Sequence, residues 1–332
     1  MSSNSPPTDL VTGGAGFIGS HLVEHLLTSG HEVWVVDDLS TGRESNLAHA
    51  RTLANDRLHF VHSDLQEWLN EAGASHSFDH IYHLAAAVGV QLVVDDPIGT
   101  IETNIHQTSA ILRFVQNTGA PMLMASTSEV YGKGVRERFS EDDDLLLGPT
   151  SRSRWSYACS KAIDEYLALA HHGQLGLPIS IARFFNTVGP RQVGDYGMVL
   201  PRFVERALAD EPVEVFGDGT QSRCFCDVRD VVQVLPRMLA SEDCPGQVMN
   251  VGNDTSITIN DLALLVCEVL ESSSAIVHVP YEEAYSPGFE DLKARVPDLE
   301  RIKSSLQFSA TIPLDQTIRD LALELERIGG AT

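Results

Sequence analysis

A tyrosine and a lysine separated by three residues are the pair whose types and spacing most clearly predict chemistry. Tyr157 and Lys161 fall near the start of an expected helix at 156–172, so their side chains share one helical face. An ammonium group beside a phenol stabilises the phenolate, which lowers the pKa of the tyrosine toward neutrality and allows it to act as a general base. Because such pairs also arise by chance on helix surfaces, the surrounding motifs decide what this pair means.

Hydroxyl and carboxylate side chains follow the strand expected at 122–126. Ser126, Thr127, Ser128 and Glu129 come where this strand ends, and open α/β sheets bind ligands at the carboxyl ends of their strands. Ser126 is explained equally well as a turn-forming hydroxyl. The segment places three hydroxyls and a carboxylate where a ligand is expected.

The segment 12–19, Thr-Gly-Gly-Ala-Gly-Phe-Ile-Gly, predicts a phosphate-binding turn between a strand and an amphipathic helix. Gly13 permits the tight turn, Gly16 lets the backbone approach phosphates, and Gly19 lets the helix pack against the strand. On its own, a glycine triplet is also explained by the sterics of a tight turn. The cofactor-binding residues expected here are Gly13, Gly16, Phe17, Ile18 and Gly19.

An acidic pair ends the next expected strand, at 32–36. Asp37 and Asp38 follow this strand, and Asp37 lies 18 residues beyond Gly19. An acidic side chain at this place accepts hydrogen bonds from the adenosine ribose and repels a 2′-phosphate, so the pattern predicts NAD rather than NADP. A capping role explains Asp38 as well as ribose binding does, and explains Asp37 less well.

Charge and composition exclude several classes of function. The chain has 332 residues and a formal net charge of −23, which disfavours nucleic acids and anionic membranes as partners. The longest apolar stretch is too short to span a bilayer, and the N-terminus has no secretory pattern, so we expect a cytoplasmic protein. The five scattered cysteines indicate neither a disulfide framework nor a zinc site, and no cluster of metal ligands is expected.

Alternating β-rich and helical segments up to about residue 185 predict a doubly wound parallel α/β sheet, the Rossmann arrangement. Strands are expected at 9–12, 32–36, 58–61, 80–84, 122–126 and 179–183, and helices at 20–29, 66–71, 97–117 and 156–172. Shorter elements follow, with helices at 201–209 and 259–270 and from 313, and strands at 213–216 and 248–251. We assign 1–185 to the NAD-binding domain, with 227–253 returning to it, and 186–226 with 254–332 to a smaller C-terminal α/β lobe for the substrate.

In their order along the chain, these motifs resemble those of the extended short-chain dehydrogenase/reductases that act on nucleotide sugars. The resemblance extends from about residue 8 to residue 325. Its matching pieces are 12–19, 83–86, Asn104, 126–132, Tyr157 with Lys161, 183–186 and 217–219. It implies a triad in which Thr127 supplies a hydroxyl, Tyr157 is the base and Lys161 also holds the nicotinamide ribose. It further implies a homodimer formed by the helices at 101–117 and 158–172.

The resemblance also implies binding residues. Arg43 is expected on the NAD adenosine, or else is a solvated loop cation; Asp64 is expected near the adenine, or else caps a helix. The further cofactor contacts implied are Leu65, Leu84, Ala85, Ala86 and Asn104. The residues implied for the UDP-sugar are Arg154, Asn186, Arg191, Arg223 and Arg295, since arginine matches phosphate geometrically. Arg295 is alternatively an ordinary surface residue.

Ser128 and Glu129 stand where 4,6-dehydratases typically carry Asp-Glu, and the missing Asp removes the acid for a departing C6 hydroxyl. Three segments look like those of the UDP-glucuronate decarboxylase (UDP-xylose synthase) subgroup, namely the Ser128-Glu129 pair, 154–157 and 221–225. That resemblance implies a 4-keto-uronate that loses CO2 and yields UDP-xylose or a UDP-4-keto-pentose. Ser128, Glu129 and Arg223 are then the candidates to handle the carboxylate, water and proton.

Two other functions stay open. One is a 4-epimerase acting on a UDP-sugar, either glucuronate or glucose, and the other is a noncatalytic NAD-binding protein. The intact set of Thr127, Tyr157 and Lys161 argues against the second. The carbon count of the product distinguishes the decarboxylase from the epimerase.

Overall fold

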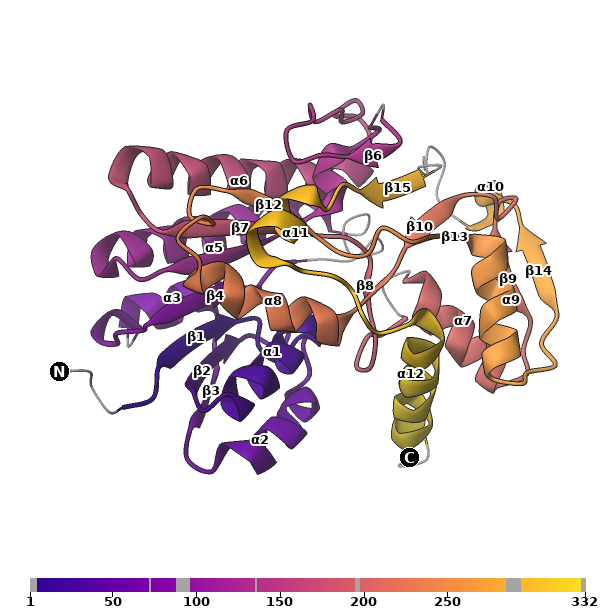
Figure 1. Ribbon diagram of the computed structural model, residues 1–332, viewed down its shortest axis with the longest axis horizontal. Coiled ribbons are helices and arrows are strands. Elements are labelled where there is room, and N and C mark those ends of the chain that lie inside the picture. Colours follow the sequence, from indigo (N-terminus) through magenta and orange to yellow (C-terminus); the bar gives the residue numbers. More distant parts are fainter. Residues whose placement is uncertain are drawn as a thin grey trace.

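The computed structural model describes residues 5–71, 73–87, 96–134, 136–194, 198–284 and 294–329. Its centre is a seven-stranded sheet with the order β12-β7-β5-β4-β1-β2-β3 (Figure 1). All neighbouring strands in this sheet run parallel. The doubly wound parallel sheet predicted from the sequence is confirmed.

The strand order reverses at the centre of this sheet. From β1 (Thr8–Thr12) the chain runs outward to β2 (Glu32–Asp37) and β3 (Leu58–His62), then returns to the other side of β1 with β4 (His80–His83). Such a reversal leaves a crevice at the carboxyl ends of the strands, where open α/β sheets bind ligands. The remaining strands are β5 (Met122–Thr127), β7 (Ile179–Phe184) and β12 (Val248–Val251).

Helices cover both faces of the sheet (Figure 1). One face carries α1 (Phe17–Thr28), α2 (Ala48–Ala54) and α8 (Val228–Ala240), and the other carries α3 (Leu65–Glu71), α5 (Pro97–Thr118) and α6 (Arg154–Leu175). The first layer buries side chains such as Leu22 and Val231, and the second buries Trp68 and Ile111. Two apolar cores therefore hold the strands in place from both sides.

A smaller lobe lies beside the carboxyl edge of the sheet (Figure 1). Its core combines α7 (Val199–Leu208), β9 (Val213–Phe216), α9 (Ile259–Val269) and α12 (Leu314–Gly329). Strands β13, β10, β15 and β6 form a four-stranded sheet in that order. The remaining elements are η1 (Glu44–Leu47), η2 (Gly73–Ser75), η3 (Ser128–Tyr131), β6 (Arg138–Phe139), β8 (Thr187–Val188), β10 (Ser222–Cys224), β11 (Cys226–Asp227), β13 (Ser256–Thr258), β14 (Ile276–Val279), α10 (Tyr281–Ala284), β15 (Ala294–Pro297) and α11 (Glu300–Leu306).

Every helix and strand expected from the sequence is present, and the elements that were not predicted, apart from α8, are all short. Each strand expected before residue 185 is present, with ends that differ by one residue. Within 227–253, α8 packs against α1, and β12 pairs with β7 at the edge of the central sheet. The two-residue strands and the seven-residue α2 are too short to show a periodic pattern. Across the described parts of the chain, no helix is both long enough and apolar enough to cross a bilayer.

Candidate functional site

A cavity of about 510 Å³ lies at the carboxyl edge of the central sheet. Gly13, which follows β1, and Leu84, which follows β4, contribute to its wall, as does Phe216 from the smaller lobe. A cavity at the point where the strand order reverses is the expected place for a dinucleotide. The cavity is lined by every site residue predicted from the sequence except Asp64 and Asn104.

The turn after β1 forms a backbone cradle at the N-terminus of α1. Gly13 has a φ of +69°, and a Cβ there would lie 2.7 Å from the backbone nitrogen of Ala85. A Cβ on Gly19 would collide with the carbonyl oxygen of Gly13. Among the described residues, no side chain caps the first turn of α1 after Gly16, so its amides and dipole are available to an anion. The cradle therefore fits the pyrophosphate of a dinucleotide.

Asp37 is buried at the end of β2 and holds the glycine turn. Its Oδ2 accepts a hydrogen bond from the amide of Ala15 at 2.8 Å, and its Oδ1 accepts one from the amide of Leu39 at 2.9 Å. Burial raises the pKa of Asp37. Each oxygen of a carboxylate can accept a second hydrogen bond, so both stay available to a ribose hydroxyl. Asp38 is exposed and accepts from the amide of Ser40 at 2.9 Å, which is the capping role considered for it.

Two residues predicted to touch the cofactor hold the protein's own backbone. The carboxylate of Asp64 accepts from two amides in the first turn of α3, at 2.8 and 3.1 Å, so Asp64 caps this helix, which is one of the two roles expected for it. Asn104 is buried, and its Oδ1 accepts from the amide of Ala87 at 2.8 Å. It positions the loop after β4 without lining the cavity. Arg43 lies exposed on the cavity wall, where either of its expected roles is possible.

The loop after β4, with Leu84, Ala85 and Ala86, forms one side of the cavity. It is held by Thr12, whose Oγ1 accepts from the amide of Ala85 at 3.3 Å and lies 2.8 Å from Nδ1 of His83. Burial and, to a lesser extent, the charge of Lys161 lower the pKa of His83 to about 3. His83 is therefore a neutral core residue.

Tyr157 and Lys161 lie on the first turns of α6 and line the cavity. Nζ of Lys161 is buried and lies 2.9 Å from Oδ2 of Asp164. Burial raises the pKa of Tyr157, and the carboxylates of Glu129 and Asp164 raise it further, although a hydrogen bond with Thr127 lowers it. The sequence predicted that Lys161 would lower this pKa toward neutrality, whereas burial and the two carboxylates keep the pKa of Tyr157 above its ordinary value.

The hydroxyls at the end of β5 have different partners. Oγ of Ser126 donates to Oε1 of Glu165 at 2.5 Å, so this hydroxyl belongs to a buried network beneath the cavity. Oγ1 of Thr127 accepts from the amide of Glu129 at 3.1 Å and caps η3. This bond uses the oxygen of Thr127 as an acceptor and leaves its proton to be donated to a ligand or to the tyrosine.

Three arginines surround the carboxylate of Glu129. Its Oε1 lies 2.5 Å from Nη1 of Arg295, and its Oε2 lies 3.7 Å from Nη2 of Arg154. Burial disfavours the ionised carboxylate, but Arg295, Arg154 and Arg223 together outweigh burial and lower the pKa of Glu129. Three guanidinium groups around one carboxylate leave a locally positive site in a protein whose net charge is −23. Such a site favours an anionic ligand.

Two of these arginines are side by side because β10 and β15 pair in parallel. The register aligns Ser222 with Ala294 and Arg223 with Arg295. Both arginines are buried, with exposed fractions of 9% and 6%, so Arg295 is not the surface residue that the sequence left possible. Within the described residues, the Nε of Arg295 has no hydrogen-bond partner, so its N–H can donate to a ligand.

Asn186 and Arg191 line the cavity from the segment that follows β7. Nδ2 of Asn186 donates to the carbonyl of Cys224 at 3.0 Å, which joins this segment to the smaller lobe. The guanidinium of Arg191 binds Glu24 at 2.6 Å and Ser20 at 3.1 Å, both on α1. Arg191 therefore lies against the helix whose N-terminus forms the cradle, rather than beside the arginines around Glu129.

The sequence reasoning missed Arg202, Phe216 and Tyr281, which also line the cavity. The guanidinium carbon of Arg202 lies 3.8 Å from the ring centre of Phe216. Gly217 has a φ of +74°, and a Cβ on it would collide with the ring of Tyr281. The available signal was an aromatic residue directly before the Gly-Asp-Gly turn at 217–219. Gly217 packs directly against the ring of Tyr281, and the rings of Phe216 and Tyr281 both line the cavity. Aromatic rings on a cavity wall suit the binding of a planar base.

Known proteins resemble this chain in sequence and in fold. The profile of the NAD dependent epimerase/dehydratase family matches residues 10–252. A UDP-N-acetyl-alpha-D-glucosaminuronate decarboxylase of Bacillus cytotoxicus is 40% identical over 312 residues, which are 94% of this chain and 95% of the relative. A UDP-glucuronic acid decarboxylase 1 of Danio rerio is 34% identical and covers 96% of this chain and 73% of its own length. Among solved structures, a UDP-glucuronic acid 4-epimerase of Bacillus cereus, in complex with UDP-glucuronic acid and NAD, aligns with a TM-score of 0.82 and 29% identity, over 97% of this chain and 99% of that one.

Proposed function

The chain belongs to the NAD dependent epimerase/dehydratase family, and we propose that it uses NAD to decarboxylate a UDP-linked hexuronate. The decarboxylases that it resembles are 34–40% identical, above the 29% of the 4-epimerase structure. The observation that carries the proposal is the group of arginines around Glu129, in the same cavity as Tyr157 and Lys161.

The residues at the carboxyl edge of the sheet fit NAD. The cradle of Gly13 and Gly19 takes the pyrophosphate, Asp37 takes the adenosine ribose, and Lys161 takes the nicotinamide ribose. When bound, NAD⁺ supplies a hydride acceptor for sugar C4 and a positively charged ring, and the return of the hydride leaves no net oxidation. The negative charge of Asp37 disfavours the 2′-phosphate of NADP.

Tyr157 is the base that removes the proton of the C4 hydroxyl. Its pKa is raised among Glu129 and Asp164, so nearby positive charge must stabilise the phenolate during the reaction. Lys161 is a cation one helical turn beyond Tyr157 on α6, and its contact with Asp164 at 2.9 Å fixes the position of its ammonium group. Thr127 hydrogen-bonds the phenol and holds it toward the sugar.

Loss of the C4 hydroxyl proton together with the C4 hydride turns a uronate into a β-keto acid, whose loss of CO2 leaves an enolate. Thr127 and Tyr157 can donate hydrogen bonds to the enolate oxygen, which lowers the barrier. Glu129 is held ionised by its arginines, so it enters the reaction as an acceptor rather than as an acid. It can orient a water, with Ser128 beside it, for protonation of the enolate carbon at C5.

Arginine placement distinguishes a uronate from a neutral hexose. A 4-epimerase acting on glucose has no second anionic group on its sugar, whereas a uronate carries a carboxylate that needs a cation. Arg154, Arg223 and Arg295 supply more positive charge than Glu129 neutralises. The unpartnered Nε of Arg295, as far as the described residues extend, is a donor suited to that carboxylate.

The substituent at C2 of the sugar gives two candidate substrates. UDP-glucuronate has a hydroxyl there, and its products are UDP-xylose or a UDP-4-keto-pentose, depending on whether the ketone leaves before reduction. UDP-N-acetylglucosaminuronate has an acetamido group, and it is favoured by the relative at 40% identity. Both share the β-keto acid chemistry, so the same residues serve either one.

The proposal is tested with purified protein, NAD and a panel of UDP-glucuronate, UDP-N-acetylglucosaminuronate and UDP-glucose. We expect release of CO2 and a nucleotide whose sugar has lost one carbon from one or both uronates, detected by mass spectrometry. Recovery of only the C4 epimer, with no CO2, would overturn the decarboxylase proposal in favour of the 4-epimerase. Absence of turnover with every substrate would favour a noncatalytic role.

We also propose a homodimer formed by α5 and α6. These two helices pack side by side and expose Ile98, Ile163 and Tyr166, with Tyr166 69% exposed. Ile163 and Tyr166 are three residues apart on α6 and share one face, as an isologous helix interface requires. Light scattering should give twice the chain mass at micromolar concentration, and Tyr166→Asp should shift it toward the monomer.

A further inference from the structure

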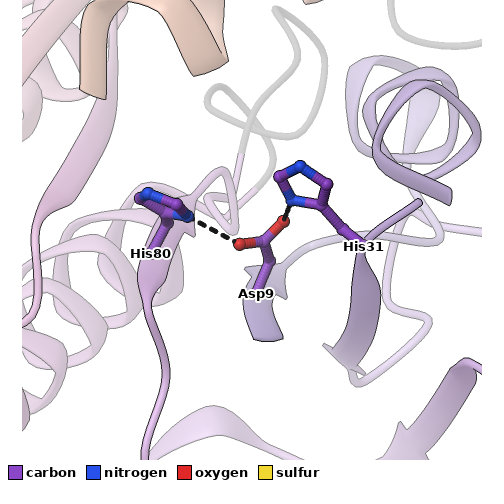
Figure 2. A group of neighbouring side chains, drawn as sticks. All are labelled: Asp9, His31 and His80. Carbon is purple, nitrogen blue, oxygen red and sulfur yellow. Dashed lines mark hydrogen bonds and ion pairs between the residues drawn. The ribbon is translucent and has the colours of Figure 1, made fainter. Parts of the chain in front are cut away.

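A second group of polar side chains lies at the opposite edge of the central sheet from the cavity. Asp9 is on β1, His31 immediately precedes β2, and His80 is the first residue of β4. Because β1 lies between β2 and β4, the two histidines approach the aspartate from either side (Figure 2). The sequence predicted no cluster of metal ligands, because these three residues are far apart along the chain and are brought together only by the fold.

The three side chains converge through their ligand atoms. Nδ1 of His31 lies 2.6 Å from Oδ2 of Asp9, and Nδ1 of His80 lies 2.9 Å from Oδ1 (Figure 2). Asp9 has no exposed side-chain surface, whereas the two histidines are 20% and 27% exposed. The carboxylate of Asp9 thus lies on the buried side of this group, and the two imidazole rings lie on the side that faces solvent.

We propose that Asp9, His31 and His80 bind one divalent zinc-class cation that joins the starts of three neighbouring strands. One ligand atom from each residue lies within 4.8 Å of the other two. Two nitrogens bound to one tetrahedral Zn²⁺ at about 2.0–2.1 Å are about 3.3–3.4 Å apart. The existing ligand atoms therefore need to close by at most about 1.5 Å, which rotations of two partly exposed rings can supply.

The donor set selects the kind of cation. Two imidazole nitrogens and one carboxylate suit Zn²⁺ and its transition-metal neighbours, whereas Mg²⁺ prefers oxygen and keeps its waters. Solvent on the histidine side can complete a tetrahedral site with water. Asp79 is a further carboxylate near His80, and it adds negative charge that favours a cation.

Protons compete with the metal for the same nitrogen atoms. A metal must displace the proton of each Nδ1. The affinity for the cation should therefore be higher at pH 8 than at pH 6.

The site is distinct from the reaction cavity. Asp9 lies on the same strand as Thr12, after which Gly13 begins the cradle, but none of the three residues lines the cavity. An ion there would cross-link β1, β2 and β4 at their amino ends and add to stability by binding only the folded chain. The metal site is therefore tested by metal binding and by stability rather than by turnover.

The test uses tag-free full-length protein that has been treated with a chelator, with Cys159 replaced by serine in every sample because it is an exposed thiol. Zn²⁺ binding is measured by competition against a chromophoric chelator, and the unfolding midpoint is measured with and without Zn²⁺. We expect one equivalent bound, an unfolding midpoint that rises with Zn²⁺ but not with Mg²⁺, and an affinity higher at pH 8 than at pH 6.

His31→Gln and His80→Gln keep a donor for Asp9 and remove a metal ligand. Each should weaken Zn²⁺ binding at least tenfold and abolish the rise in midpoint. His59→Gln is the matched control, since His59 pairs with Glu32 at 2.9 Å on the same sheet without a second histidine on that carboxylate. Binding that is equal in all four proteins, or absent from the unsubstituted one, would overturn the metal site and leave a hydrogen-bonded triad.

Discussion

Nη1 of Arg295 lies 2.5 Å from Oε1 of Glu129, although 166 positions separate the two residues in the chain. This ion pair joins the smaller lobe to the strand end that carries Thr127. It also keeps Glu129 ionised, which determines what that carboxylate can do in the reaction.

Glu129→Gln should slow product formation far more than it weakens NAD binding. The change keeps the shape of the side chain but removes the negative charge that faces the three arginines. It also replaces a carboxylate oxygen by an amide group that cannot take up a proton and that orients a water less strongly. Loss of an acid–base group typically costs about 10²–10⁴ in rate. Turnover is measured as CO2 release and NAD binding by calorimetry. Glu211→Gln, in an exposed ion pair with Arg206, is the control and should leave both unchanged; equal loss of NAD binding in Glu129→Gln would contradict this role.

Asp164→Asn should move the pH dependence of kcat/KM to lower pH. The carboxylate of Asp164 raises the pKa of Tyr157 and balances the charge of Lys161. A neutral amide at that position lowers the pKa of the tyrosine, so the phenolate forms at lower pH and the ascending limb shifts with it. Tyr157→Phe is the companion variant and should give no NADH signal with any uronate. An ascending limb that stays in place in Asp164→Asn would mean that another group sets it.

Asp37→Ala should weaken NAD binding and reduce discrimination against NADP. Removal of the carboxylate also leaves the amides of Ala15 and Leu39 without their acceptor, which costs about 1–3 kcal/mol of stability. Asp38→Ala is the matched control because that residue is exposed and bonds only locally. Both cofactors are compared by fluorescence titration, and a preference of the unsubstituted protein for NADP would refute the assignment of Asp37.

Stability should fall as the pH decreases from about 6.5 toward 3. The folded protein holds the pKa of His83 at about 3, mainly through burial, whereas the unfolded chain protonates this histidine near 6.5. Below pH 6.5 the unfolded state therefore binds a proton that the folded state does not, and each such group lowers the free energy of unfolding by up to about 1.4 kcal/mol per pH unit. Urea denaturation at several pH values measures the slope. It should be shallower in His83→Gln and unchanged in a variant of the exposed His62.

The central sheet could be predicted because its signals are local. Each strand of this sheet corresponds to a short apolar run in the sequence, and each long helix shows a 3.6-residue period. The burial of Val35 in a strand and of Leu22 in a helix can therefore be predicted from their immediate neighbours. The cradle is equally local, since Gly13 and Gly19 are required by contacts within one turn and the adjoining loop. The sequence therefore located the cofactor half of the cavity well.

The substrate half depends on contacts that no local pattern reveals. The pairing of Arg223 with Arg295 comes from strands of three and four residues. The position of Asp164 beside Lys161 follows the helical spacing, but its effect on the pKa of Tyr157 depends on burial, which the sequence does not give. Asn104 matches a family motif, yet it acts through the backbone of Ala87.

The parallel pairing of β10 with β15 has a consequence for protein synthesis. A ribosome that has released residues 1–290 has already made the glycine cradle, Tyr157 and Lys161, but not Arg295. A chain terminated there retains the cofactor-binding residues and lacks the guanidinium that holds Glu129. Leu299, Ile302 and Leu306, which complete the core that packs behind the cradle, are made after residue 290 as well, so the same late segment supplies both the guanidinium that holds Glu129 and part of the support for the cofactor half of the cavity.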